Sequence, residues 1–386
     1  MFDKKNKIVI MIYGNVMLYP PVINLIECLL NNSYRVHLVA EGIDDLPSVI
    51  TDASKFSYHN VLSKPRGSLV NRITRRYYLE SQYRRELSYR VGPQDILWTV
   101  NPIVVRILGK RIEKYSSQHV MQLFELMENE NIPLFNGSRF FKFNIADISR
   151  HAWKNVVAER NRAYIQKAQW GLKKLPYILP NKPYYYEPGD ESEEIRIVIN
   201  KMKKESRRII IYLGVIDPDR DFESFARAIE NIKEDYCLYM FGKVPADRKE
   251  AFQAFCNKYK CVEYMGFFNP PSHLHFLKYA HIALVPYAPG KTANNTSSIN
   301  ALYCAPNKIY EYAGSSLPML GTDVLGLREP FERFNIGMCC DDLEPKTIVN
   351  TIRMIESHYN EMKNNCVTFY NSTDLDQIID RIVNDD

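Results

Sequence analysis

Short apolar runs alternate with amphipathic stretches along the first part of the chain. Residues 7–13 form a mostly apolar run that ends at Gly14 and Asn15, residues 22–30 place apolar side chains at helical spacing, and residues 34–40 return to a strand pattern. A strand buried in a parallel sheet shows such a run, whereas a helix lying on the sheet shows a 3.6-residue period. The pattern predicts a strand–helix–strand unit with ligand-binding residues at the carboxyl ends of its strands.

The same alternation continues to the end of the chain. Further strands are expected at residues 95–100, 119–124, 209–213, 236–241, 261–265, 282–286, 317–321 and 336–340. The two series are separated by a segment rich in proline, tyrosine and acidic residues, which is typical of a linker. We therefore expect an α/β protein with two Rossmann-like doubly wound domains facing a cleft. The expected boundaries are an N-terminal domain at 1–183, a linker region at 184–204, a C-terminal domain at 205–370 and a C-terminal helix at 371–386 that packs back on the first domain.

The most informative stretch follows the apolar run at 282–286. After a polar loop comes the sequence Pro306-Asn307-Lys308-Ile309-Tyr310-Glu311-Tyr312-Ala313-Gly314. Proline suits the first turn of a helix and glycine its end, so one or two helical turns are expected here. Because Lys308 and Glu311 are three residues apart, they share one face of this helix.

This face suits a nucleoside diphosphate. The free N–H groups at the start of the helix and the charge of Lys308 would meet phosphate oxygens, while Glu311 would accept hydrogen bonds from a ribose diol. The alternative is an ordinary surface pair of lysine and glutamate, which stabilises a helix by only about 0.3–0.5 kcal/mol. Spacing alone does not decide between them.

Small turn residues follow the strands of the second series. Gly214 and Gly266 each end a strand, and glycine lets the backbone N–H approach a ligand closely. Two cations, Arg220 and Lys243, lie in loops at the same expected edge of the sheet. Together with Lys308, they predict a rim of positive charge for a diphosphate.

In the first series, Gly14 and Asn15 fall where a cleft is expected, and no GxGxxG fingerprint occurs there. Glu125 follows the strand at 119–124, which is where a doubly wound domain places catalytic groups. We expect Glu125, and with less support Glu128, as a general base. An ordinary solvated glutamate in a loop is an alternative with equal support.

Composition is that of an ordinary soluble protein, with 46% hydrophobic residues, 25% charged residues and a net charge of +5. Basic residues nevertheless crowd residues 64–90, interleaved with tyrosines. They are Lys64, Arg66, Arg72, Arg75, Arg76, Arg84, Arg85 and Arg90. Such a segment either contacts an anionic membrane surface or is a solvated helix face, and nucleic acid is disfavoured because no nucleic-acid motif accompanies it. The first apolar run is too short for a secretory signal or a bilayer span, so a cytoplasmic protein is expected. Association with the inner face of the membrane through residues 64–90 depends on which of these two interpretations of the segment holds.

Metal binding is not expected. The eight cysteines show no CxxC pair, and His273-x-His275 is interpreted as two histidines on a helix surface. Two DxD patterns, 217–219 and 219–221, precede a helix, where aspartates commonly cap N–H groups. No cofactor is expected either.

The second domain resembles the GT-B glycosyltransferases, and is similar to family four and its relatives. The resemblance is carried by the stretch from Pro306 to Gly314 and by the glycine-containing segments 317–321 and 326–329. It implies that Arg220 and Lys308 take the donor diphosphate, Glu311 the ribose, and the loop at Gly266 and Phe267 the base. Two positions depart from the family pattern. Tyr303 stands where the family has a glutamate. Val215 stands where it has an arginine, and Lys243 would supply the missing positive charge for the phosphate.

The resemblance implies transfer of a hexose from a nucleotide-diphosphate sugar, without a metal ion, to a glycan or lipid-linked acceptor in cell-surface polysaccharide synthesis. Arg220, Lys308 and, for proton transfer, Glu125 are the expected catalytic residues, with Gly14 and Asn15 on the acceptor side. The alternatives are a nucleotide-sugar epimerase on the same frame and a non-catalytic partner protein that binds a nucleotide sugar.

Overall fold

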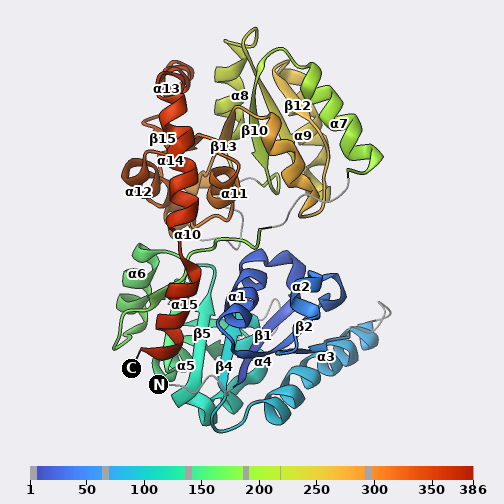
Figure 1. The fold of residues 1–386 in the computed structure, drawn as a ribbon, viewed down its shortest axis with the longest axis vertical. Coiled ribbons are helices and arrows are strands. Elements are labelled where there is room, and N and C mark those ends of the chain that lie inside the picture. Colours follow the sequence, from blue (N-terminus) through green and yellow to red (C-terminus); the bar gives the residue numbers. More distant parts are fainter. Residues whose placement is uncertain are drawn as a thin grey trace. The chain divides into compact units, whose positions relative to one another are not determined.

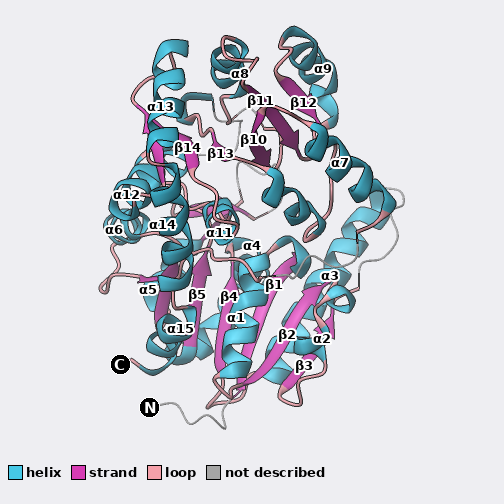
Figure 2. Ribbon diagram, turned by 45° about the horizontal axis from the view of Figure 1, so that its top comes forward, coloured by secondary structure: helices cyan, strands magenta, loops and turns pink. Residues whose placement is uncertain are grey.

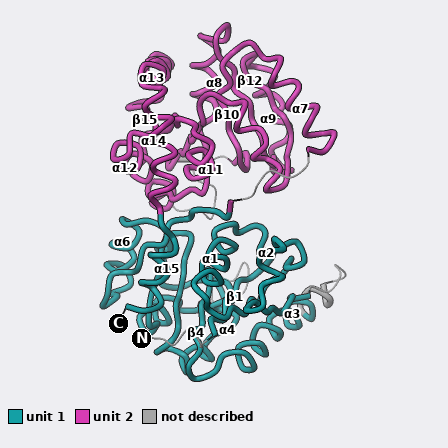
Figure 3. The backbone as a smooth tube through the Cα atoms, in the orientation of Figure 1, with its two compact units in different colours: residues 1–184, 374–386 teal, residues 185–373 magenta. Residues whose placement is uncertain are grey.

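The computed structural model describes residues 7–62, 69–134, 141–185, 191–217, 219–291 and 298–385. The chain forms two compact units (Figures 1 and 3). The first contains residues 1–184 together with 374–386, and the second contains residues 185–373. The last helix, α15 (Leu375–Asn384), therefore belongs to the first unit, whereas α7 (Glu193–Lys204), which occupies part of the range expected as a linker, belongs to the second.

The first unit is built on a seven-stranded sheet of order β3-β2-β1-β4-β5-β8-β9, in which every recorded pairing is parallel. Its strands are β1 (Lys7–Asn15), β2 (Arg35–Glu41), β3 (Phe56–Asn60), β4 (Ile96–Val100), β5 (His119–Leu123), β8 (Lys154–Val157) and β9 (Tyr177–Ile178). A short antiparallel pair, β6 (Asn131–Pro133) and β7 (Lys142–Asn144), lies outside this sheet. The strand order reverses between β1 and β4, which makes the carboxyl ends of these two strands the switch point of the sheet.

Helices cover both faces of this sheet (Figure 2). The helical elements of this unit are η1 (Val16–Leu18), α1 (Pro20–Asn31), η2 (Ile43–Asp45), α2 (Ser48–Thr51), α3 (Leu69–Arg90), α4 (Pro102–Leu108), η3 (Gly109–Gln118), α5 (Ile145–His151), α6 (Arg160–Trp170) and α15. Side chains of β1, β4 and β5 pack with those of α3, α4 and α5 in one buried cluster. α15 packs against α1, and the buried Lys154 donates a hydrogen bond of 2.7 Å to the carbonyl of Ile382 in its last turn.

The second unit is built on a six-stranded sheet of order β12-β11-β10-β13-β14-β15, again with parallel pairings. Its strands are β10 (Arg208–Leu213), β11 (Tyr236–Phe241), β12 (Val262–Tyr264), β13 (Ile282–Val285), β14 (Met319–Thr322) and β15 (Gly337–Cys340). The order reverses between β10 and β13, as it does in a doubly wound sheet. The prediction of two Rossmann-like doubly wound domains is confirmed.

Two buried clusters, one on each face of the sheet, form the core of the second unit. One joins the strands to α7, η5 (Ser272–Tyr279), α11 (Lys308–Gly314) and α14 (Tyr359–Ser372). The other joins them to α8 (Phe222–Glu230) and α13 (Pro345–Ser357). The remaining helices are η4 (Ala246–Arg248), α9 (Lys249–Lys258), η6 (Pro289–Lys291), α10 (Ser298–Leu302) and α12 (Leu325–Phe334).

Candidate functional site

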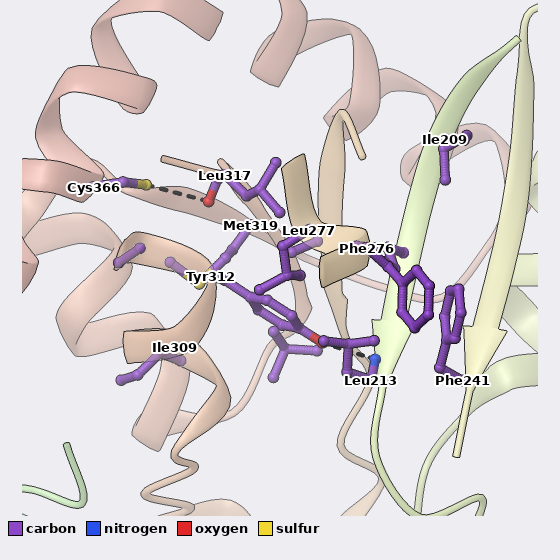
Figure 4. Packing of buried hydrophobic residues seen from close by; sticks show 14 of the residues in the cluster. Ile209, Leu213, Phe241, Phe276, Leu277, Ile309, Tyr312, Leu317, Met319 and Cys366 are labelled. Atoms are coloured by element: carbon purple, nitrogen blue, oxygen red, sulfur yellow. Dashed lines mark hydrogen bonds between the residues drawn. The ribbon is translucent and has the colours of Figure 1, made fainter. Parts of the chain in front are cut away.

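The short helix α11 is fixed to the end of β10 by a buried tyrosine. The backbone N–H of Leu213 donates a hydrogen bond of 3.0 Å to the hydroxyl of Tyr312, whose side chain is fully buried (Figure 4). Ile309 is buried on the same side of the helix, whereas Lys308 and Glu311 are only partly buried. The helical turns predicted here are present. The helix begins at Lys308, two residues after Pro306, and with seven residues it is too short to supply a strong dipole.

Lys308 lies directly over Gly214. A Cβ atom added to Gly214 would come within 2.7 Å of the Lys308 Nζ, so only glycine leaves room for the ammonium group here. Gly214 also has a φ of +142°, which other residues rarely adopt. Partial burial, followed by the positive charge of Arg220, lowers the pKa of Lys308 to about 8. The structure thus places two of the predicted residues, Lys308 and Gly214, in contact at the carboxyl end of β10.

Arg220 lies close enough to Lys308 to affect its ionisation, and it is held by two neighbours. Its guanidinium forms an ion pair with Asp219 and stacks over the ring of Tyr287 at 3.8 Å from the ring centroid. The role of Asp219 was missed by sequence reasoning, which interpreted the DxD patterns only as helix caps. That interpretation is correct for Asp221, whose carboxylate accepts a hydrogen bond of 3.0 Å from the N–H of Ser224.

The loops after β10, β11 and β12 touch one another through their backbones. Gly242, which follows β11, lies so close to Gly214 that a Cβ atom at Gly242 would overlap the carbonyl of Gly214. Its N–H donates a hydrogen bond of 2.9 Å to the carbonyl of Gly266, the glycine predicted to lie near a base. Phe267 beside it is 53% exposed. Lys243 is exposed, and its carbonyl accepts a hydrogen bond of 3.0 Å from the N–H of Ile216, so it lies at this same edge of the sheet.

Glu311 faces a histidine that the sequence did not single out as functional. The Nε2 of His273 lies 3.6 Å from a carboxylate oxygen of Glu311, and the two side chains are 16% and 13% exposed. His273 is partly buried and His275 is buried, so the interpretation of these residues as surface histidines was wrong. Although burial raises the pKa of Glu311, the neighbouring His273 and the charge of Lys308 outweigh this effect, and the net pKa is lowered. Glu311 is therefore ionised at neutral pH.

The first unit carries a separate group of predicted residues near its own switch point. Gly14 has a φ of +94°, and the side chain of Asn15 accepts a hydrogen bond of 2.8 Å from the N–H of Met17, so Asn15 caps η1. Glu125 is 66% exposed at the side chain and lies 3.7 Å from the buried guanidinium of Arg162. Asn101, which follows β4 and has a φ of +67°, was missed by the sequence analysis. Its side-chain oxygen accepts a hydrogen bond of 3.2 Å from the N–H of Phe124.

Comparison with known proteins bears on the fold. No protein-family model matches the chain, and no curated protein matches it at a significant level. Solved structures match over nearly the whole chain. The glycosyltransferase WaaG, involved in lipopolysaccharide biosynthesis, is 13% identical with a TM-score of 0.62, covering 98% of this chain and 100% of its own. Anabaena HepE in complex with UDP-glucose is 11% identical with a TM-score of 0.65, covering 97% of this chain and 98% of its own. AviGT4, a glycosyltransferase involved in avilamycin A biosynthesis, is 15% identical with a TM-score of 0.58, covering 99% of both chains.

The chain has the GT-B fold. Solved structures that are 11–15% identical to this chain show its fold but not its activity, so the activity is argued from the residues. Within this GT-B fold, the charged cluster of Lys308, Arg220 and Glu311 belongs to the second unit, and Glu125 belongs to the first. Membership of family four stays a prediction.

Most of the arginines on α3 whose side chains are described take part in ion pairs. Lys64 and Arg66 lie outside the described residues, as does the side chain of Arg72. On α3, four arginines share two glutamates. Arg76 and Arg84 pair with Glu80, and Arg85 and Arg90 pair with Glu86. The exposed tyrosines Tyr77 and Tyr89 lie on the same helix.

No group of three or more histidine, cysteine, aspartate or glutamate side chains in the part of the chain that the structure describes is arranged to hold a metal ion. None of the described helices is both long and apolar enough to cross a membrane.

Proposed function

We propose that this protein is a glycosyltransferase that uses a nucleotide-diphosphate sugar as donor. The observation that carries the proposal is the position of Lys308, which extends over Gly214 at the switch point of the second sheet, one helical turn from the carboxylate of Glu311. Ligands of doubly wound sheets bind at this point. The proposal is supported by the likeness in fold to HepE, which was solved with UDP and with UDP-glucose.

In the proposed complex, Lys308 and Arg220 bind the diphosphate. A lysine whose pKa is lowered to about 8 gains a counter-charge when a diphosphate binds, so its ammonium form is favoured in the complex. Glu311, already ionised, accepts hydrogen bonds from the ribose. The base rests by the exposed ring of Phe267 beside Gly266, and Lys243 lies at the rim of the diphosphate site.

The catalytic device in this proposal is electrostatic. Negative charge develops on the departing phosphate as the bond to the sugar breaks, and prearranged cations stabilise that charge. Removal of one such donor typically slows a reaction by about 10²–10³-fold. The proton of the acceptor hydroxyl passes to Glu125 if configuration inverts, or to the departing phosphate if it is retained. The step requires no metal ion or organic cofactor.

We place the acceptor on the first unit, near Gly14, Asn15 and Glu125, and propose a glycan or a lipid-linked sugar used in cell-surface polysaccharide synthesis. The proposed location is the cytoplasmic face of the membrane. Exposed tyrosine rings on a helix with basic residues suit the interface of an anionic bilayer. Tyr77 and Tyr89 are 70% and 76% exposed on α3.

Two assays test the proposal in sequence. The first is a thermal-shift screen of the full chain against UDP, GDP, ADP and their sugars, since a ligand at 100 times its Kd stabilises a protein by about 2.7 kcal/mol. The second measures release of nucleoside diphosphate from each sugar nucleotide that binds, with no metal added and with EDTA present. Slow hydrolysis is expected of a transferase without its acceptor. Tight binding with no turnover, with acceptor-containing membranes present, would instead indicate a non-catalytic binding protein, and sugar isomerisation would indicate an epimerase.

A further inference from the structure

The contact between His273 and Glu311 lies beside the proposed ribose site and is made by two separate elements. His273 lies in η5, which follows the loop after β12, and Glu311 lies in α11. The histidine Nε2 and the carboxylate Oε1 are 3.6 Å apart, and both side chains are mostly shielded from water. At this distance the contact is electrostatic and exceeds hydrogen-bond length. A contact between two helical elements that border one site can fix the geometry of that site.

One oxygen of the Glu311 carboxylate, Oε1, faces the Nε2 of His273. Shielding a carboxylate from water without a partner costs free energy, so the contact with His273 favours the orientation of the group in which Oε1 stays near the ring. In that orientation the other oxygen can accept a hydrogen bond from a ligand.

We propose that His273 is a positioning residue that orients Glu311 to accept a hydrogen bond from a ribose hydroxyl. This inference rests on the proposed nucleotide site. His273 itself does not touch the nucleotide in this arrangement. Its Nδ1 is buried without a partner among the described residues, so the ring is held by packing and by its contact with Glu311.

The inference is tested by discrimination between ribose and deoxyribose. Calorimetry of the full chain with UDP and 2′-deoxy-UDP, repeated with GDP and 2′-deoxy-GDP, gives the ratio of the two Kd values. A hydrogen bond to a charged group corresponds to about a tenfold or greater ratio in the wild type. We expect His273→Ala to reduce this ratio at least threefold by weakening the ribonucleotide alone, and His273→Gln, which keeps an N–H donor, to restore part of it. His358→Ala, which changes an exposed histidine of the same unit, should leave the ratio at its wild-type value.

The outcomes separate this inference from the function on which it rests. If Glu311→Ala abolishes discrimination while His273→Ala retains it, the positioning role is overturned and the nucleotide site stands. If Glu311→Ala leaves discrimination intact, or if the wild type binds neither nucleotide pair, the site itself is wrong and both proposals fall. Circular dichroism and thermal unfolding of each variant establish that it is folded. If His273→Ala does not fold, the comparison is made with His273→Gln and His273→Asn, where an unchanged ratio in the shorter Asn variant would overturn the inference.

Discussion

The ammonium group of Lys308 occupies the space that a side chain on Gly214 would fill, so helix α11 and the end of strand β10 meet at one point. A Cβ atom on Gly214 would come within 2.6 Å of the Lys308 Cε and 2.7 Å of its Nζ. The contact joins residues from two elements that are far apart in sequence and brings a cation to the switch point of the sheet.

Gly214→Ala should displace Lys308 without unfolding the protein. The clash is with the far end of a flexible side chain, which can move, although the positive φ adds strain. We expect about tenfold weaker binding of UDP or GDP, with a thermal unfolding temperature lowered by a few degrees. Gly290→Ala is the matched control, because a Cβ atom there meets nothing within 4 Å. Unchanged nucleotide affinity in Gly214→Ala would show that Lys308 does not bind the ligand from this position.

Nucleotide affinity should fall as pH rises above the pKa of Lys308. That pKa is lowered to about 8 in the free protein, so the ammonium form dominates at pH 7 and is a minority at pH 9. If the diphosphate binds only the charged form, the Kd at pH 9 should be about tenfold higher than at pH 7. Lys308→Arg stays charged over this range and should give a flat profile. A wild-type profile as flat as that of the arginine variant would contradict the assignment.

Tyr312→Phe tests the anchoring of α11. The change removes the hydroxyl that accepts the Leu213 N–H and leaves that buried donor unpaired, which costs about 1–3 kcal/mol. Chemical denaturation should show a destabilisation of this size and calorimetry a weaker nucleotide complex. Tyr185→Phe, at a side chain that is 55% exposed in the same unit, provides the control and should change neither quantity.

Lys154→Met tests the attachment of α15 to the first unit. The ammonium group donates to the carbonyls of Ile382 and Asp385 and lies 3.8 Å from the ring centroid of Trp153. Methionine has a similar length and no donor, so the last turn of α15 should lose its cap and exchange its amide hydrogens faster. Hydrogen-exchange mass spectrometry measures this. The exposed Lys173→Met should leave exchange in α15 unaltered.

Much of the fold was predictable from the sequence because buried parallel strands and amphipathic helices have different periods. The runs at 209–213 and 236–241 correspond to β10 and β11 almost residue for residue. The short helix after Pro306 was predictable for a different reason, since proline and glycine mark its two ends.

The partners of the charged residues were not predictable. His273 lies 38 positions before Glu311 in the sequence, and only the packing of η5 beside α11 brings the two side chains together. The pairing of Asp219 with Arg220 was hidden because neighbouring residues commonly point apart in a loop. The ion pairs on α3 could have been predicted from the four-residue spacing of Arg76, Glu80 and Arg84. A simple count of charges overlooks this spacing.

The central claim is that Lys308 and Glu311 together bind a nucleoside diphosphate. Calorimetric titration of UDP and GDP into the wild type, Lys308→Ala and Glu311→Ala tests it most directly. Each variant should bind the preferred nucleotide about tenfold more weakly, a loss of about 1.4 kcal/mol, while remaining folded. Wild-type affinity in both folded variants would contradict the account.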